Sequence, residues 1–263
     1  CWGTPFDATP ADVTFTDTVV DLALGDGFGC AALSTGDVEC FGEPSVTELA
    51  GVHTTDAASV HVCAGEGHVC ALLDDQTVQC WGLNTFGQVG NGESGDPELF
   101  PRDVSSLTSV SHLACGKSHS CAALDDGTVW CWGANLAGQL GDGTTEVKLT
   151  PVQVTSLGTA NVVQVAAGRA HTCARTSAGA VSCWGENDRG QLGNADPGIA
   201  SAIAQHVEGL MGTATHLAAG HDHSCAVLDT GAIMCWGLNT SGELGDGTTT
   251  SWPVPVWVQA ECP

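Results

Sequence analysis

Fourteen cysteines are the residues of this 263-residue chain most suited to chemistry, as disulfides, metal ligands or nucleophiles. Metal sites prefer clustered ligands such as Cys-x-x-Cys, and the sequence contains no such motif. Five pairs are instead separated by ten positions: Cys30/Cys40, Cys70/Cys80, Cys121/Cys131, Cys173/Cys183 and Cys225/Cys235. This constant spacing favours disulfides and an oxidising location, meaning secreted, cell-surface or periplasmic. A thiol nucleophile is therefore not expected.

Four histidines stand two residues before a cysteine: His68, His119, His171 and His223. A ring of imidazoles could bind a metal or titrate near neutral pH. The alternative is a structural role, in which each ring is hydrogen-bonded to neighbouring backbone. We favour the structural role, because Phe28 takes the histidine position in the first unit and a ligand ring would not tolerate that exchange easily.

Acidic, glycine-rich segments form a third set of candidates. Carboxylate and carbonyl oxygens in such segments can bind Ca²⁺, which makes Asp96, Asp142 and Asp246 weak candidate ligands. None of the segments has EF-hand spacing, so we expect solvated surface loops and no cofactor. Neither Gly-x-Ser-x-Gly nor His-Glu-x-x-His occurs, and the protein is expected not to be an enzyme.

Composition narrows the class of protein. The formal net charge is −24, with 30 Asp and Glu against 6 Lys and Arg, whereas nucleic acids and anionic membranes need a basic surface. No apolar run approaches the length of a membrane span, about 20 residues. We therefore expect neither nucleic-acid binding nor membrane insertion. Because the chain begins at Cys1 without a visible signal peptide, it is interpreted as a mature product or an excised domain.

These residues recur because the chain is an internal repeat. The tag Cys-Trp-Gly or Cys-Phe-Gly begins at Cys1, Cys40, Cys80, Cys131, Cys183 and Cys235. Each unit shows short alternating stretches typical of β-strands. Between the paired cysteines lies a turn such as Asp125-Asp126-Gly127, which suits a three-residue hairpin loop and places Cys121 opposite Cys131. The turn Asp74-Asp75-Gln76 lacks glycine, so this hairpin is predicted to be the most strained.

The repeats are 40–52 residues long, and each has about four strands. Repeats of this kind predict an all-β fold, a single β-propeller over residues 1–263. We expect six blades, with five as the alternative: units near 18–51, 58–104, 109–154, 161–207 and 214–256, and a composite closing blade of 1–17 with 257–263. Pairing of the terminal strands would close the ring through a Cys1–Cys262 bond. Cys63 and Cys115, offset by one residue against the aligned histidines, are predicted to link two adjacent blades.

Two motifs carry a resemblance to a known family. Cys-Trp-Gly-x-Asn-x-x-Gly-Gln-Leu-Gly, at 131–141 and at 183–193, and Ala-Gly-x-x-His-x-Cys-Ala resemble the regulator of chromosome condensation repeat. The resemblance covers nearly the whole chain and implies a propeller, typically of seven blades. It also suggests protein partners, because the family includes a nucleotide-exchange factor and an inhibitor of β-lactamases. The chain departs from the pattern after Gly3 and Gly42, where the Asn-x-x-Gly-Gln-Leu-Gly loop is missing.

The tag aromatics are expected to pack between blades, although a sugar-stacking platform is the alternative. They are Trp2, Phe41, Trp81, Trp132, Trp184 and Trp236. Trp252 and Trp257 fall outside the repeat and suit an exposed apolar contact or the sealing of the closure.

The sequence favours a non-enzymatic extracellular protein-interaction or assembly module, one version of which self-associates into a multimer or fibre. An inhibitor-like propeller and a carbohydrate-binding propeller are the alternatives. Four units carry long loops, within 83–103, 134–155, 186–208 and 238–257, and we expect this arc to carry the contact surface. Its candidate contact residues are Glu93, Asp96, Glu98, Asp142, Glu146, Asp188, Asp196, Asp246, Trp252 and Trp257.

Overall fold

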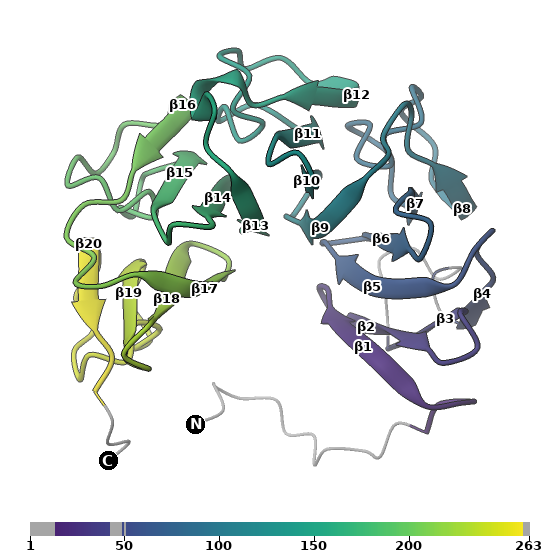
Figure 1. Cartoon of the computed structure of the whole chain (residues 1–263), viewed down its shortest axis with the longest axis horizontal. Helices are drawn as coiled ribbons and strands as arrows, with labels where there is room; N and C mark the ends of the chain where they lie inside the picture. Colours follow the sequence, from purple (N-terminus) through teal and green to yellow (C-terminus); the bar gives the residue numbers. More distant parts are fainter. Residues whose placement is uncertain (1–13, 43–48, 50, 260–263) are drawn as a thin grey trace.

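Five four-stranded antiparallel sheets form the described part of the protein, each built from four strands consecutive in the chain. The structure, a computed structural model, describes residues 14–42, 49 and 51–259. The sheets stand side by side around a common centre as propeller blades (Figure 1). Within the described ranges, no helix is long and apolar enough to cross a membrane.

The blades share one plan, with the first strand nearest the centre and the fourth at the periphery (Figure 1). Blade 1 comprises β1 (Val19–Leu24), β2 (Phe28–Leu33), β3 (Val38–Gly42) and β4 (Gly51–His53). Blade 2 comprises β5 (Ser59–Ala64), β6 (His68–Leu73), β7 (Val78–Gly82) and β8 (Glu98–Asp103). Blade 3 comprises β9 (Val110–Cys115), β10 (His119–Leu124), β11 (Val129–Gly133) and β12 (Lys148–Gln153). After the short 3-10 helix η2 (Thr155–Leu157), blade 4 comprises β13 (Val162–Ala167), β14 (His171–Thr176), β15 (Val181–Gly185) and β16 (Ser201–His206). Blade 5 comprises β17 (Ala214–Ala219), β18 (His223–Leu228), β19 (Ile233–Gly237) and β20 (Trp252–Trp257).

The predicted hairpin register is confirmed. Cys121 pairs with Cys131 across β10 and β11, and Gly127 closes the turn with a φ of 80°. In the glycine-free turn of blade 2, Gln76 must adopt a φ of 66°, a region that disfavours side chains with a Cβ. Strain at this hairpin follows from the missing glycine, as predicted.

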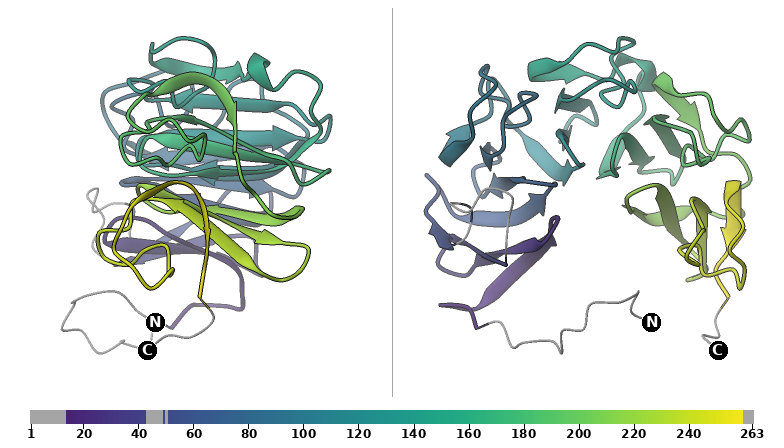
Figure 2. Two further views of the ribbon diagram at one scale, coloured as in Figure 1. Left: turned by 90° about the vertical axis from the view of Figure 1, so that its left-hand side faces the viewer. Right: turned by 180° about the vertical axis from the view of Figure 1, so that it is seen from behind.

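The blade count differs from the expectation of six. The described residues form five blades, and the arc between blade 1 and blade 5 is not closed by them (Figures 1 and 2). Trp257 belongs to β20 of blade 5, opposite Met234, and not to a composite blade. Blade 1 also extends two residues past the predicted boundary, to His53. Residues 1–13 and 260–263, on which the closing blade and the Cys1–Cys262 pair were predicted, lie outside the described residues.

Six of the seven predicted cysteine pairs lie within the described residues, and all six have sulfurs at bonding distance. The five hairpin pairs have Cα–Cα distances of 4.0–4.1 Å. Cys63 and Cys115 join the innermost strands of blades 2 and 3 with a Cα–Cα distance of 5.4 Å. The one-residue offset of Cys63 and Cys115 against the aligned histidines therefore does place the two cysteines on facing sides of adjacent blades.

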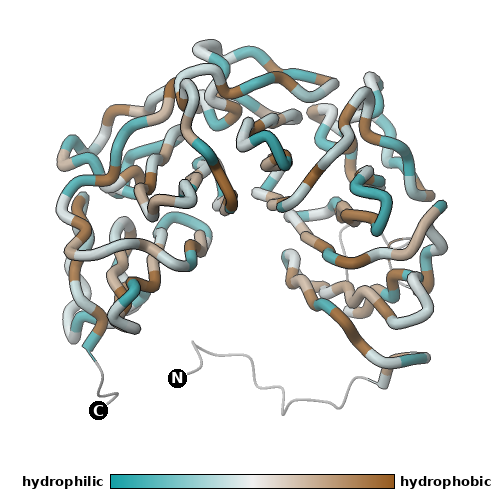
Figure 3. Tube along the Cα trace, in the orientation of Figure 1, coloured by the Kyte–Doolittle hydropathy of each residue, from teal (hydrophilic) through white to brown (hydrophobic). Residues whose placement is uncertain are grey.

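The hydrophobic core lies between the blades. One cluster joins Val129 and Leu140 of blade 3 to Val165 and Trp184 of blade 4, and hydrophobic segments recur in every blade (Figure 3). Four tag tryptophans, Trp81, Trp132, Trp184 and Trp236, are fully buried. They fill the space between neighbouring sheets, as predicted for the tag aromatics, and they are not available as a sugar-stacking platform.

Candidate functional site

Four long loops rise from one face of the propeller. Each follows the third strand of its blade, at residues 83–97, 134–147, 186–200 and 238–251. Because successive strands are antiparallel, these loops lie at the same end of the sheets as the turns between first and second strands. We call this end the loop face. The two-strand hairpins with Asp74, Asp125 and their equivalents lie at the opposite end.

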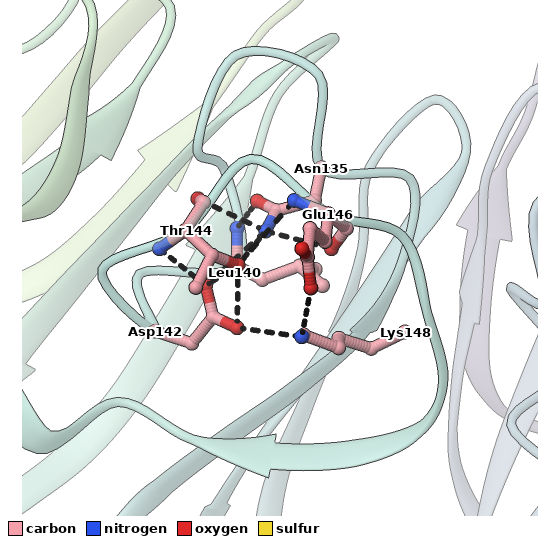
Figure 4. Close-up of polar contacts among 6 residues, drawn as sticks. All are labelled: Asn135, Leu140, Asp142, Thr144, Glu146 and Lys148. Carbon is pink, nitrogen blue, oxygen red and sulfur yellow. Dashed lines mark hydrogen bonds and ion pairs between the residues drawn. The ribbon is translucent and has the colours of Figure 1, made fainter.

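A buried asparagine organises each loop, and Asn135 shows how. Its amide nitrogen donates to the carbonyls of Thr144 and Glu146, at 3.1 and 3.0 Å, and to Asp142 Oδ1 at 3.2 Å (Figure 4). Its side-chain oxygen accepts from the backbone N–H of Leu140 at 3.0 Å. One fully buried side chain thus ties both ends of a surface loop together.

The other three loops repeat this arrangement. The asparagine oxygens of Asn84, Asn187 and Asn239 accept from Val89, Leu192 and Leu244 at 3.2, 3.1 and 2.9 Å. Their amide nitrogens donate to carbonyls nine residues later, those of Glu93, Asp196 and Thr248. The repeated asparagine of the motif therefore has a structural explanation as the internal support of each loop.

Two of the three Ca²⁺ candidates, Asp142 and Asp246, have carboxylates that accept hydrogen bonds within their own loops. Asp142 Oδ1 accepts from the backbone N–H and hydroxyl of Thr144, and Lys148 Nζ lies 3.6 Å from Oδ2 (Figure 4). Although partial burial acts to raise it, these bonds hold the pKa of Asp142 below its usual value. Asp246 has the equivalent bonds from Thr248 and Asn239. In both loops an asparagine N–H group donates to the aspartate carboxylate, while Asp96 is exposed in the first loop.

The Gln-Leu-Gly part of the motif connects each blade to the next. The main-chain carbonyl of Gln139 accepts two bonds from blade 4, from Trp184 Nε1 at 2.8 Å and from Thr172 Oγ1 at 2.9 Å. The intervening Leu140 is fully buried in the interface.

The aligned histidines are structural, but their partners differ from those expected. His68, His119 and His171 are fully buried, and each Nε2 lies 2.9 Å from a hydroxyl of the next blade, not from backbone. Those hydroxyls belong to Ser120, Thr172 and Ser224. Burial lowers the pKa of the three imidazoles to about 4, 3 and 4. His223, in the last described blade, has no such hydroxyl partner among the described residues, and burial lowers its pKa as well.

Sequence reasoning missed a ring of charged residues around the central opening. A cavity of about 450 Å³ opens there on the loop face, between the turns that follow the first strand of each blade. One residue per blade contributes to its polar lining: Asp26, Glu66, Lys117, Arg169 and His221. They occupy the first variable position of the Ala-Gly-x-x-His motif. A position that varies between constant neighbours was the signal in the sequence that could have identified this ring.

Ion pairs connect this ring from blade to blade. Lys117 Nζ lies 3.0 Å from Glu66 Oε1, and Arg169 bridges Asp222 of blade 5, at 3.0 Å, and Glu186 of its own blade. The backbone continues the connection, since the N–H of Lys117 donates to the carbonyl of Gly168. The opening thus has a mixed-charge rim held by contacts between neighbouring blades.

The predicted contact residues lie along the loop face and the outer strands. Glu93, Asp96, Glu146, Asp188 and Asp196 are exposed, whereas Glu98, Asp142 and Asp246 are half-buried. Trp252 and Trp257 on β20 are 38% and 43% exposed, and Trp252 Nε1 donates to Asp246 Oδ2 at 3.0 Å. The structure therefore brings Trp252 and Asp246 into one hydrogen-bonded pair and leaves most of the other acidic side chains in solvent.

Fold and site together define a propeller whose blades are locked to one another and whose loops are supported from within. The comparisons with known proteins give its family: the model of the RCC1-like domain matches residues 2–262, and the chain belongs to this family. Among curated relatives, the human protein named probable E3 ubiquitin-protein ligase HERC6 is 35% identical over 192 residues, which are 72% of this chain and 19% of HERC6. The chain thus spans about a fifth of that relative's length.

Solved structures share the fold. Human WBSCR16 has a TM-score of 0.83 at 22% identity, over 93% of this chain and 67% of that one. Yeast RCC1 (Prp20), solved with Kap60 bound to it, has a TM-score of 0.78 at 23% identity, over 92% of this chain and 61% of that one. At these identities the likeness concerns the fold alone.

Proposed function

We propose that this protein is a non-enzymatic protein-binding module that recognises its partner through the loop face. The observation that supports this proposal most is the contrast between the base and the tip of each loop. The bases are the same four buried asparagines with the same hydrogen bonds. The tips differ from loop to loop: Thr85-Phe86, Leu136-Ala137, Asp188-Arg189 and Thr240-Ser241.

A rigid base with a variable tip is the arrangement by which loops on a scaffold carry recognition. The tips and outer strands also expose large apolar side chains, with Leu136 74% and Phe100 70% accessible. Apolar anchors beside acidic residues provide both burial and charge selectivity to a protein interface. The complex of yeast RCC1 with Kap60 is a case in which a propeller of this fold has a protein partner.

The test is a comparison of two surfaces in one binding assay. A partner is captured on the immobilised oxidised protein, identified, purified and then titrated against variants. Leu136→Asp and Arg189→Asp alter two loop tips, and Asp74→Ser alters an exposed hairpin on the opposite face. We expect the loop variants to weaken binding about tenfold or more and the hairpin variant to bind normally. Equal loss in all three, or no loss in the loop variants, would contradict the proposal.

Two more specific versions of this proposal differ in the partner that the loop face binds. In the first, the partner is a second copy, and light scattering of the purified protein shows a mass that rises with concentration. In the second, an inhibitor-like propeller meets a basic enzyme with its acidic loops, and the association rate falls steeply with added salt. We favour a foreign protein partner, because two copies of the chain, each with a net charge of −24, would repel each other.

An oxidising compartment, extracellular or periplasmic, is the location we propose. The support is that all twelve cysteines in the described residues are paired, five times within a hairpin and once between blades. Disulfides persist in such compartments and are rare in reducing ones. Expression with and without export tests this: we expect folded protein only from the exported form, and equal yields of protease-resistant protein would contradict it.

A further inference from the structure

Three sulfurs gather where blades 2 and 3 meet, close to their innermost strands β5 and β9 (Figure 1). The Sγ atoms of Cys63, Cys70 and Cys115 all lie within 4.8 Å of one another. Two different disulfides come together at this point, since Cys63 is bonded to Cys115 across the junction and Cys70 to Cys80 within blade 2. All four sulfurs are bonded, so none of them is a thiolate that could hold a metal ion.

None of the other four described blades has this arrangement. Cys63 is the residue opposite Cys70 across β5 and β6. In each of the other blades the residue opposite the first hairpin cysteine is an alanine, at Ala23, Ala114, Ala166 and Ala218. The additional sulfur in blade 2 is therefore a departure from the repeat, and the hairpin disulfide does not require it.

Cys70 has a cysteine opposite it on both neighbouring strands. Its Cα lies 4.1 Å from that of Cys80, the spacing of an antiparallel pair that exchanges no backbone hydrogen bonds. The backbone N–H and carbonyl of Cys70 therefore point the other way, towards Cys63, and a pair of that kind has Cα atoms about 5.5 Å apart. Disulfides span Cα distances of about 4.4–6.8 Å. A bond between Cys63 and Cys70 thus needs no change in the register of the sheet.

Of the four cysteines, Cys115 is the one that solvent reaches. It is half-buried and lines the cavity of about 450 Å³ at the central opening. Cys63 is only 8% exposed, and Cys70 and Cys80 are completely buried. The rate of thiol–disulfide exchange depends on access and on which sulfur is attacked. A thiol that enters the opening therefore meets the inter-blade disulfide at Cys115.

The junction has other contacts that remain when the inter-blade disulfide opens. His68 Nε2 lies 2.9 Å from Ser120 Oγ, and the backbone N–H of Glu66 donates to the carbonyl of Lys117 at 3.0 Å. Both contacts join blade 2 to blade 3 close to the sulfurs. They keep a released Cys63 beside the hairpin disulfide of its own blade, and such proximity accelerates a reaction between the two groups.

We propose that Cys115 is a thiol-exchange site, which takes a small thiol from solution and passes the exchange on to the hairpin disulfide of blade 2. The incoming thiolate attacks Cys115 Sγ, a mixed disulfide forms there, the bond to Cys63 breaks, and Cys63 leaves as a thiolate. This thiolate attacks Cys70 Sγ, the bond between Cys63 and Cys70 forms, the bond to Cys80 breaks, and Cys80 takes up the proton that the incoming thiol lost. The sulfur of the incoming thiol is oxidised, that of Cys80 is reduced, and the number of disulfide bonds is unchanged. The proposal does not depend on the proposed function.

Mapping the products of the reaction tests both steps. The folded protein is treated at mildly alkaline pH with a limiting amount of 2-mercaptoethanol, so that a second molecule does not displace the first. Acid then stops the exchange, free thiols are blocked with N-ethylmaleimide, and peptic peptides are analysed without reduction. We expect mercaptoethanol on Cys115, a link between Cys63 and Cys70, and N-ethylmaleimide on Cys80. The mixed disulfide should form at least about tenfold faster than the completely buried hairpin pair of blade 4 opens.

Two matched double variants separate the steps. Cys70→Ala with Cys80→Ala removes the second disulfide, so the mixed disulfide should still form and Cys63 should be recovered as a free thiol. Cys173→Ala with Cys183→Ala removes the equivalent hairpin disulfide of blade 4, which has an alanine in place of the additional cysteine. This control should leave the products in blades 2 and 3 unchanged.

Two results in the unaltered protein would overturn the proposal. The first is attachment of mercaptoethanol to Cys63 instead of Cys115, or opening of the blade 4 hairpin pair at the same rate as the inter-blade pair. The second is recovery of Cys63 as a free thiol while Cys70 and Cys80 remain bonded to each other, because the exchange would then stop at the first step. Both are measured without any substitution, so the test holds even if a double variant fails to fold.

Discussion

His119 Nε2 lies 2.9 Å from Thr172 Oγ1, a residue 53 positions away in the next blade. Because Thr172 Oγ1 donates its own proton to the carbonyl of Gln139 at 2.9 Å, it can only accept from the imidazole. His119 therefore carries a proton on Nε2. Its Nδ1 is buried without a partner in the described structure, and because burial lowers the pKa to about 3, the ring is neutral. His68 and His171 have the same arrangement with Ser120 and Ser224.

These buried neutral histidines predict that the folded protein loses stability in acid at pH values above the range where carboxylates titrate. Burial lowers the pKa of these histidines to about 3 or 4, whereas the unfolded value is about 6.5. Below pH 6.5 the unfolded state therefore binds more protons than the folded state. The contribution of these histidines to the stability of the fold is complete above pH 6.5 and falls as the pH drops towards 4. We expect each histidine to cost of order 1–2 kcal/mol of unfolding free energy at pH 5 relative to pH 7.5.

Urea denaturation at the two pH values measures this effect. His119→Gln retains a side-chain donor and removes the titration, so the loss between pH 7.5 and 5 should shrink. His206→Gln, at an exposed position on β16, is the matched control and should leave the loss unchanged. An identical pH dependence in His119→Gln and the unaltered protein would contradict the assignment.

Two buried tryptophans should respond differently to the same substitution. Trp132 Nε1 donates to Gln88, whereas Trp81 Nε1 finds no acceptor in the described part of the chain. Trp132→Phe removes ring volume and a hydrogen bond, and should cost about 1 kcal/mol more than Trp81→Phe, which removes ring volume and no hydrogen bond to the described residues. Chemical denaturation of the two variants measures the difference, and equal losses would show that the hydrogen bond contributes nothing net.

The hairpin of blade 2 can be stabilised by one substitution. Gln76 has a φ of 66°, where the equivalent residue in blade 3 is Gly127 with a φ of 80°. Gln76→Gly removes the left-handed strain of about 1 kcal/mol, although it loses the bond from Gln76 Nε2 to Asp125. We expect a higher melting temperature for Gln76→Gly and a lower one for Gly127→Gln, measured by calorimetry. A lower value for Gln76→Gly would mean that the bond to Asp125 outweighs the strain.

The hydrogen bonds at the centre of the loop in Figure 4 can be tested by one substitution. Asn135→Asp replaces two N–H donors by oxygen and places a second carboxylate beside Asp142. Without metal this variant should be destabilised by about 2–4 kcal/mol, because several buried acceptors lose their donor. Millimolar Ca²⁺ should raise its melting temperature more than that of the unaltered protein, since the oxygens now face one another. Asn161→Ala, at an exposed bond to Ser177, serves as the control and should respond weakly to both changes.

Asn239 lies in the sequon Asn239-Thr240-Ser241 but is fully buried, and its amide makes hydrogen bonds inside the loop. A glycan on this nitrogen would require the loop to open. We therefore predict that the folded fraction obtained from a eukaryotic secretory pathway carries no glycan at Asn239. Intact mass before and after glycosidase treatment measures this, and a folded, glycosylated fraction with an unchanged melting temperature would contradict it.

Sequence alone determined the repeat, the propeller class and the cysteine pairing of the hairpins. These are local features: ten residues with a central turn bring Cys121 opposite Cys131 whatever surrounds them. The single-residue offset of Cys63 and Cys115 also sufficed, because alternation along a strand assigns each side chain to one face. The strained turn at Gln76 followed for the same reason, since a missing glycine is visible in the sequence.

The tertiary structure alone decided which side chains meet between blades. The hydroxyl partner of His119, the two donors to the Gln139 carbonyl and the charged ring around the opening join residues about 30 to 50 positions apart or from different blades. Their meeting depends on how each sheet is placed against the next, and strand periodicity does not encode that placement. The same holds for the blade count, because the repeat fixes the blades one at a time while closure depends on the angle accumulated around the ring.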